Sequence, residues 1–118
     1  QDLSYKLAAA KQKLMTEKIA EIPVEQENVI LFETDLDTPV IRNVVNELTA
    51  VHTGVCGIFV GEEESGYQFI IGSSTKDCRE IAARLRESAG ARGGGSAAMI
   101  QGSVKEREEK LKELLEQI

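Results

Sequence analysis

The residues in this sequence with the clearest capacity for chemistry are three consecutive glycines, Gly93–Gly95, that follow Arg92. Glycine has no side chain, so a ligand can approach its backbone amides closely, and amides beside a guanidinium suit a phosphate group. Residues 76–104 carry five basic and three acidic side chains, whereas the whole chain has a net charge of −6. The segment therefore predicts a local basic surface suited to phosphates. At least one of the glycines is expected to need a positive φ, so Gly94→Val is expected to distort the loop that they form.

A helix expected from Lys76 to Ala89 would place further cations near the glycines. Arg79 and Arg86 are seven residues apart, so they lie on one flank of that helix, with Lys76 near them and Arg92 beyond its end. An ordinary charged surface helix beside a structural loop fits the same pattern, and charge and periodicity leave both interpretations open. The residues expected to face the core are Cys78, Ile81, Ala82, Leu85 and Ala89.

The glycine run also matches the GxGxxA dinucleotide fingerprint, at Gly93, Gly95 and Ala98. That fingerprint follows a strand and opens a helix, whereas this run follows an expected helix and precedes an expected strand. The sequence has no GK[ST] ending of a phosphate-binding P-loop. We therefore expect no nucleotide cofactor.

Catalytic or metal chemistry is hard to assemble from the other residues. His52, the only histidine, lies near an expected helix end and is interpreted as structural or solvated. Cys56 and Cys78 lack a CxxC spacing and lie in apolar runs, which predicts buried free thiols in a cytosolic protein. The EEESG sequence at 62–66 is more typical of a hairpin turn than of a metal site. The chain is therefore expected to be non-catalytic, and no apolar run reaches membrane-spanning length.

These residues belong to an expected α+β domain, a small mixed sheet flanked by helices. Asp37 or Thr38 is the expected N-cap of its first helix; Thr75 and Gly90 are the expected caps of its second. The glycine run is expected to be a loop between that helix and the last strand. Strands are expected at 28–33, 54–61, 67–74 and 97–103, helices at about 38–50 and 76–89, and a last helix with Val104, Leu111, Leu115 and Ile118 along one stripe.

A lead helix is expected ahead of this domain, over residues 3–21, with Pro23 ending it. Because the chain opens on Gln1 and not on methionine, we expect a piece of a longer protein in which this helix continues upstream. We therefore divide the chain into a lead helix, 1–22, and a globular domain, 23–118. Packing of the helix on its own domain is the other interpretation. Its apolar residues recur as in a coiled-coil seam at Leu3, Leu7, Ala10 and Leu14.

The stretch RGGGSAAMIQGS resembles the glycine-rich signature of the DHHA1 domain, which occurs at the C-terminus of alanyl-tRNA synthetases. The expected order of elements also fits that domain, over nearly the whole chain. The sequence departs from the signature at Arg92, Ser96, Ala98 and Ile100. The positions that match it are Gly93, Gly94, Gly95, Met99, Gln101 and Gly102.

The resemblance implies a DHHA1-like domain that binds the outer corner of a transfer RNA, tRNA-Ala, while reading little sequence. It would help aminoacylation and editing act on one tRNA in the cytoplasm. Alanine activation with ATP, and the zinc of the editing domain, would belong to other parts of an alanine–tRNA ligase. The candidate RNA-binding residues are Lys76, Arg79, Arg86, Arg92, Gly93, Gly94, Gly95 and Gln101.

Two alternatives remain open. The same domain type binds substrate in DHH-type phosphoesterases, which usually carry histidine where this chain has Ser96. The chain could instead be an oligomerisation module, a homodimer formed through the Leu3–Leu14 seam and the Val104–Ile118 stripe. If the chain belongs to an alanyl-tRNA synthetase, the other domains of that synthetase are expected partners.

Overall fold

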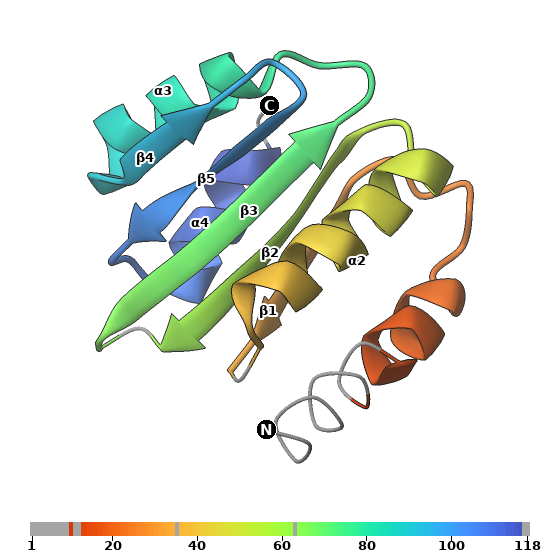
Figure 1. The fold of residues 1–118 in the computed structure, drawn as a ribbon. Coiled ribbons are helices and arrows are strands. Elements are labelled where there is room, and N and C mark those ends of the chain that lie inside the picture. The colour runs from red at the N-terminus through yellow and green to blue at the C-terminus, as the bar shows by residue number, and fades with distance from the viewer. Residues whose placement is uncertain (1–9, 11–12, 35, 63, 117–118) are drawn as a thin grey trace.

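A computed structural model describes residues 10, 13–34, 36–62 and 64–116. They form one five-stranded sheet with helices on both faces (Figure 1). The strands are β1 (Val29–Glu33), β2 (Val55–Glu62), β3 (Gly66–Ser73), β4 (Arg92–Gly95) and β5 (Met99–Val104). The helices are α2 (Thr38–Val51), α3 (Cys78–Ala89) and α4 (Glu108–Glu116), preceded by a lead helix whose described residues are 10 and 13–20. The α+β class with a mixed, helix-flanked sheet is confirmed.

The strand order is β1-β2-β3-β5-β4, so the glycine-rich β4 is an edge strand. Strands β1 and β2 are parallel because α2 connects them as a crossover, and the other neighbouring strands are antiparallel. A short turn joins β4 to β5, closed by a hydrogen bond of 2.9 Å from the Ser96 amide to the Met99 carbonyl. The chain therefore returns on itself immediately after the glycines.

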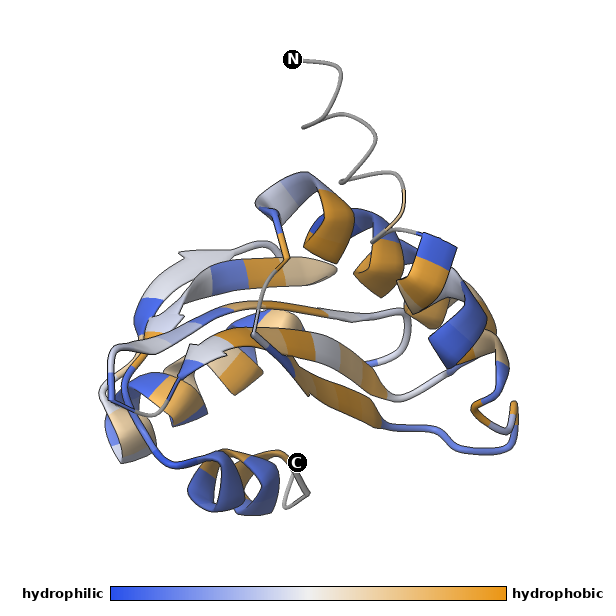
Figure 2. Cartoon of the chain, turned by 90° about the horizontal axis from the view of Figure 1, so that it is seen from below, coloured by the Kyte–Doolittle hydropathy of each residue, from blue (hydrophilic) through white to orange (hydrophobic). Residues whose placement is uncertain are grey.

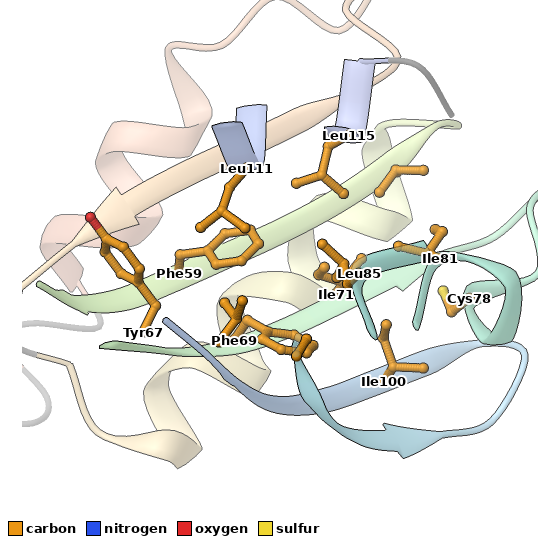
Figure 3. Packing of buried hydrophobic residues seen from close by; sticks show 13 residues of the cluster. Phe59, Tyr67, Phe69, Ile71, Cys78, Ile81, Leu85, Ile100, Leu111 and Leu115 are labelled. Atoms are coloured by element: carbon orange, nitrogen blue, oxygen red, sulfur yellow. The ribbon is translucent and has the colours of Figure 1, made fainter. Parts of the chain in front are cut away.

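Each face of the sheet has its own hydrophobic core, because successive side chains of a strand point to opposite faces. Figure 2 shows α2 and the lead helix on one side of the sheet and α3 and α4 on the other. The core beneath α2 includes Val40, Val44, Leu48, Cys56, Ile58 and Ile70. The core beneath α3 and α4 includes Phe59, Tyr67, Phe69, Ile81, Leu85, Ile100, Leu111 and Leu115 (Figure 3).

Part of the sheet is left uncovered on the α2 side. Helix α2 packs against β2 and β3, and within the described ranges no helix lies in front of β5 and β4 (Figure 1). Ile100 and Val104 of β5 point into the core on the other side. Gln101 and Ser103, which alternate with them, therefore project from the uncovered side and are exposed. We call this part of the sheet the open face.

The glycine run forms strand β4, where the sequence predicts a loop. Gly93 has a φ of +131°, a conformation that side chains rarely permit, and a Cβ there would come within 2.3 Å of the Gln101 carbonyl oxygen. The expected positive φ is thus present, but at Gly93. At Gly94 φ is not positive, and a Cβ would meet nothing within 4 Å. The strain expected of Gly94→Val is therefore assigned to the wrong glycine.

The predicted caps of α2 and α3 are confirmed at some positions and wrong at one. Asp37 is the N-cap of α2, as one of two candidates, and Gly90 ends α3 with a φ of +68°. The N-cap of α3 is Asp77 and not Thr75. Thr75 has another partner, because its hydroxyl donates to the carbonyl of Thr53.

The last helix is shorter than the predicted stripe. Leu111 and Leu115 are buried, as expected, but Val104 belongs to β5, where it reaches the same core from the sheet. Ile118 lies outside the described residues. The stripe therefore combines a strand residue with two helix residues.

The lead helix packs on the domain with a residue outside the predicted seam. Met15 is 5% exposed and belongs to the core beneath α2, whereas Leu14 is 64% exposed. Ala10 is also exposed, and Leu3 and Leu7 lie outside the described residues. The described part of the seam therefore faces away from the domain.

Candidate nucleic-acid interface

Two of the predicted site residues, Lys76 and Arg79, lie on either side of Asp77, the N-cap of α3. The Asp77 carboxylate accepts hydrogen bonds from the Arg79 backbone amide at 2.9 Å, from Nε at 3.0 Å and from Nη2 at 2.9 Å. The Arg79 side chain, with its backbone amide, lowers the pKa of Asp77, and the Asp77 carboxylate raises that of Arg79. The charge of Arg79 is therefore balanced within the protein. Lys76 is exposed, and its backbone amide donates to the Ser73 hydroxyl.

The last turn of α3 holds Arg86, which reaches the glycine strand. Its Nη2 donates to the carbonyl oxygen of Gly93 at 3.1 Å. The hydrogen bond between Ser96 and Met99 shows which residues of β4 bond to β5, because hydrogen-bonded pairs recur at every second residue of an antiparallel pair. These residues are Gly94 and Arg92. The backbone groups of Gly93 and Gly95 then point outward from the sheet edge, which is where Arg86 meets Gly93.

Arg92 and Gln101 lie on the other side of the sheet, on the open face. Arg92 pairs across β4 and β5 with Ser103, and Gly94 pairs with Gln101. Directly opposed residues of an antiparallel pair project to the same face. Arg92 therefore shares the open face with Gln101 and Ser103, whereas α3 and its arginines belong to the opposite layer.

A hollow of about 450 Å³ lies on the open face, between the start of α2 and β4. Its polar lining residues are Thr38, Gln68, Arg92, Gln101 and Ser103. A second hollow, of about 440 Å³, continues past Arg92 to Ser65 and Lys105. The two share Gln68, Arg92 and Ser103, and we call them together the trough.

Arg42 of α2 borders the trough, and our sequence reasoning missed it. Its Nη2 donates to the Gln101 Oε1 at 2.9 Å and so joins α2 to β5. One signal could have identified it: Arg42 is the single basic residue of segment 23–75, which holds nine acidic ones. Gln68, Ser103 and Lys105 were missed as well, because nothing local in the sequence distinguishes them.

The structure thus distributes the predicted site residues over two layers. Arg79 and Arg86 lie on α3 and Lys76 lies just before its N-cap, and Arg86 is hydrogen-bonded to the glycine strand. Arg92, Gly93 and Gln101 line the first hollow together. The strand β4 stands between the two groups, with Gly93 in contact with both.

The other reactive side chains have structural positions. His52 is 2% exposed, with Nδ1 2.6 Å from the Gln26 carbonyl oxygen, which confirms the structural interpretation. Cys56 and Cys78 are buried free thiols, as predicted, and burial raises the pKa of Cys56 to about 11. Among the described residues, no cluster of potential ligands could hold a metal ion. None of the described helices is long and apolar enough to cross a membrane.

Comparison with known proteins agrees with this architecture. The DHHA1 domain profile matches residues 13–118, so the chain belongs to the DHHA1 domain family. A solved structure with a similar fold is the C-Ala domain from Aquifex aeolicus alanyl-tRNA synthetase, with 20% sequence identity and a TM-score of 0.61. The similarity covers 77% of this chain and 92% of that one. No curated protein matches the sequence significantly.

Proposed function

We propose that this chain is the C-terminal tRNA-binding domain of an alanyl-tRNA synthetase. It binds the outer corner of tRNA-Ala and helps the aminoacylation and editing domains act on the same tRNA in the cytoplasm. The domain itself performs no reaction and needs no cofactor, and the ATP and zinc of the parent ligase are bound by its other domains. Family membership and the C-Ala-like fold support this proposal.

The observation that carries it is the glycine strand β4. Its backbone is bare at Gly93 and Gly95, Arg92 stands at its start, and Arg86 lies across its edge. Outward-facing amides beside guanidinium groups can bind phosphate oxygens without reading base sequence. Lys76, Arg79, Arg86, Arg92, Gly93–Gly95 and Gln101 remain the candidate contact residues of this proposal.

Titration of a tRNA-Ala transcript into the protein at several salt concentrations tests the proposal. Each phosphate neutralised by a basic side chain steepens the slope of log binding constant against log salt concentration by about 0.9. Binding should therefore weaken steeply as the salt concentration rises. Arg79→Ala and Arg86→Ala should weaken binding, and Arg84→Ala, an exposed arginine elsewhere on α3, is the control. Absence of binding at low salt would refute the proposal.

The exposed seam residue Leu14 and the exposed Val24 and Val51 favour a second candidate, an oligomerisation module. Sedimentation with and without tRNA distinguishes the two. A tRNA-binding domain should sediment with the RNA, whereas an oligomerisation module should form a concentration-dependent dimer that ignores it.

A further inference from the structure

We infer that the trough on the open face receives the sugar–phosphate backbone of an RNA strand, with Arg42 and Arg92 holding phosphates from its two sides. The inference rests on the proposed function, because it names the surface of this domain that the tRNA touches. It adds Arg42, Gln68, Ser103 and Lys105 to the candidate contact residues.

The chemistry of the trough is that of an anion site. Arg92 and Lys105 are cationic, Thr38, Ser65 and Ser103 carry hydroxyls, and Gln68 and Gln101 carry amides. Among the described residues that line the two hollows, none is acidic, although the chain holds 20 acidic residues. A concave surface with one sign of charge concentrates counterions, here phosphates, even on an acidic protein.

The Arg42–Gln101 hydrogen bond orients this surface before any ligand binds. Because the Gln101 Oε1 accepts from Arg42, the part of the amide that remains for a ligand is the Nε2 donor. The other N–H groups of the Arg42 guanidinium can still donate to a phosphate. Gly93 and Gly102, which lack side chains, also line the first hollow, so a backbone can approach the sheet closely there.

At Arg79, the α3 flank is a weaker phosphate site than the trough. Arg79 is held in hydrogen bonds to a carboxylate, whereas Arg86, like Arg42, donates to a neutral oxygen. A phosphate at Arg79 would therefore compete with Asp77. At the trough, Arg42 donates to a neutral amide, so its positive charge is not balanced by that contact.

Four single variants and the tRNA titration test the inference. Arg42→Ala and Arg92→Ala should each weaken tRNA binding roughly tenfold, as expected for a hydrogen bond to a charged group, and should lower the salt slope by about one. Gln101→Glu is nearly isosteric and can still accept from Arg42, but it places a negative charge where a phosphate is expected, so it should weaken binding as strongly. Asn43→Asp adds the same charge beside Arg42 on the exposed surface of α2 and should change binding little. Circular dichroism melting verifies that each variant is folded.

The outcomes separate this inference from the proposed function. If wild-type protein binds tRNA and the trough variants bind it equally well, while Arg79→Ala and Arg86→Ala weaken it, the trough assignment is wrong and the proposed function stands. Equal weakening by Asn43→Asp and Gln101→Glu would also overturn the trough, because the effect would be general charge.

If the wild-type protein binds no tRNA, the proposed function fails, and a short single-stranded RNA followed by amide chemical shifts decides the trough. Shifts at Gln68, Gln101 and Ser103 would uphold the phosphate site. Their absence would overturn it.

Discussion

The Arg86 guanidinium donates a hydrogen bond of 3.1 Å to the Gly93 carbonyl oxygen, and this contact ties the last turn of α3 to the edge strand of the sheet. Gly93 is also the glycine with a φ of +131° and a lining residue of the trough. The contact therefore joins a basic helix, a strand whose conformation at Gly93 requires glycine, and the open face.

Arg86→Ala should loosen the edge strand more than it destabilises the fold. The hydrogen bond is exposed, so its loss should cost less than about 1 kcal/mol of unfolding free energy. Faster hydrogen exchange of the Arg92 and Gly94 amides, which bond to β5, relative to wild type and to Arg84→Ala, would reveal the loosened strand. Unchanged exchange at both amides would mean that Arg86 does not hold β4.

Gly93→Ala should destabilise the protein clearly. The substitution forces a side chain into a φ of +131° with its Cβ 2.3 Å from the Gln101 carbonyl oxygen, so a loss of about 1–3 kcal/mol is expected from strain alone. Gly94→Ala is the matched control, since a Cβ there meets nothing within 4 Å, and it should change stability by less than about 0.5 kcal/mol. Chemical denaturation of both variants measures the difference. Equal effects at the two glycines would contradict the conformation of β4.

Asp77→Asn should give a pH-dependent change in stability. The hydrogen bonds from Arg79 lower the pKa of Asp77 in the folded state, so this carboxylate stabilises the fold above the unfolded pKa of about 3.9, and the contribution is lost as pH falls through the folded pKa. The Tm difference between wild type and Asp77→Asn should therefore be largest near neutrality and shrink below about pH 4.

The matched control is Asp37→Asn, at the N-cap of α2, where no side-chain hydrogen bond caps the helix. It should leave the Tm nearly unchanged. A Tm difference for Asp77→Asn that is constant from pH 7 to pH 2 would show that its charge is not involved.

Met15→Ala tests whether the lead helix is part of the folded domain. Met15 is 5% exposed in the core beneath α2, and truncation of a buried methionine typically costs about 2–5 kcal/mol. Leu14→Ala, at a neighbouring position that is 64% exposed, should cost less than about 0.5 kcal/mol. Urea denaturation compares them, and a larger effect at Leu14 would indicate that the helix packs through its seam.

The two cysteines should be inert in the native protein. Cys56 is fully buried, and its pKa is raised to about 11. A thiol reagent at pH 8 should therefore react slowly with the native protein. After unfolding, without prior reduction, the same reagent should count two thiols. Because unfolded cysteine ionises from about pH 8.5, stability should fall as pH rises above that value. Rapid reaction of the native protein would contradict the burial of these side chains.

Local patterns in the sequence determined the order of the elements apart from β4, the buried face of α3, Asp37 as one of two candidate caps of α2, the cap Gly90, and the free thiols. These features follow from hydrophobic periodicity and from backbone preferences within a few residues, so neighbours along the chain suffice to predict them. The glycine signature also indicated the family.

Tertiary structure alone decided how the candidate site is divided between two layers. Arg42 meets Gln101 at a separation of 59 residues, and the run at Gly93–Gly95 becomes a strand only because β5 turns back to pair with it. The same pairing places Arg92 on the open face, while α3 carries Arg79 and Arg86 on the other side of the sheet. Strand pairing depends on partners distant in sequence and on the alternation of a sheet's two faces, and neither is contained in the residues that flank an arginine.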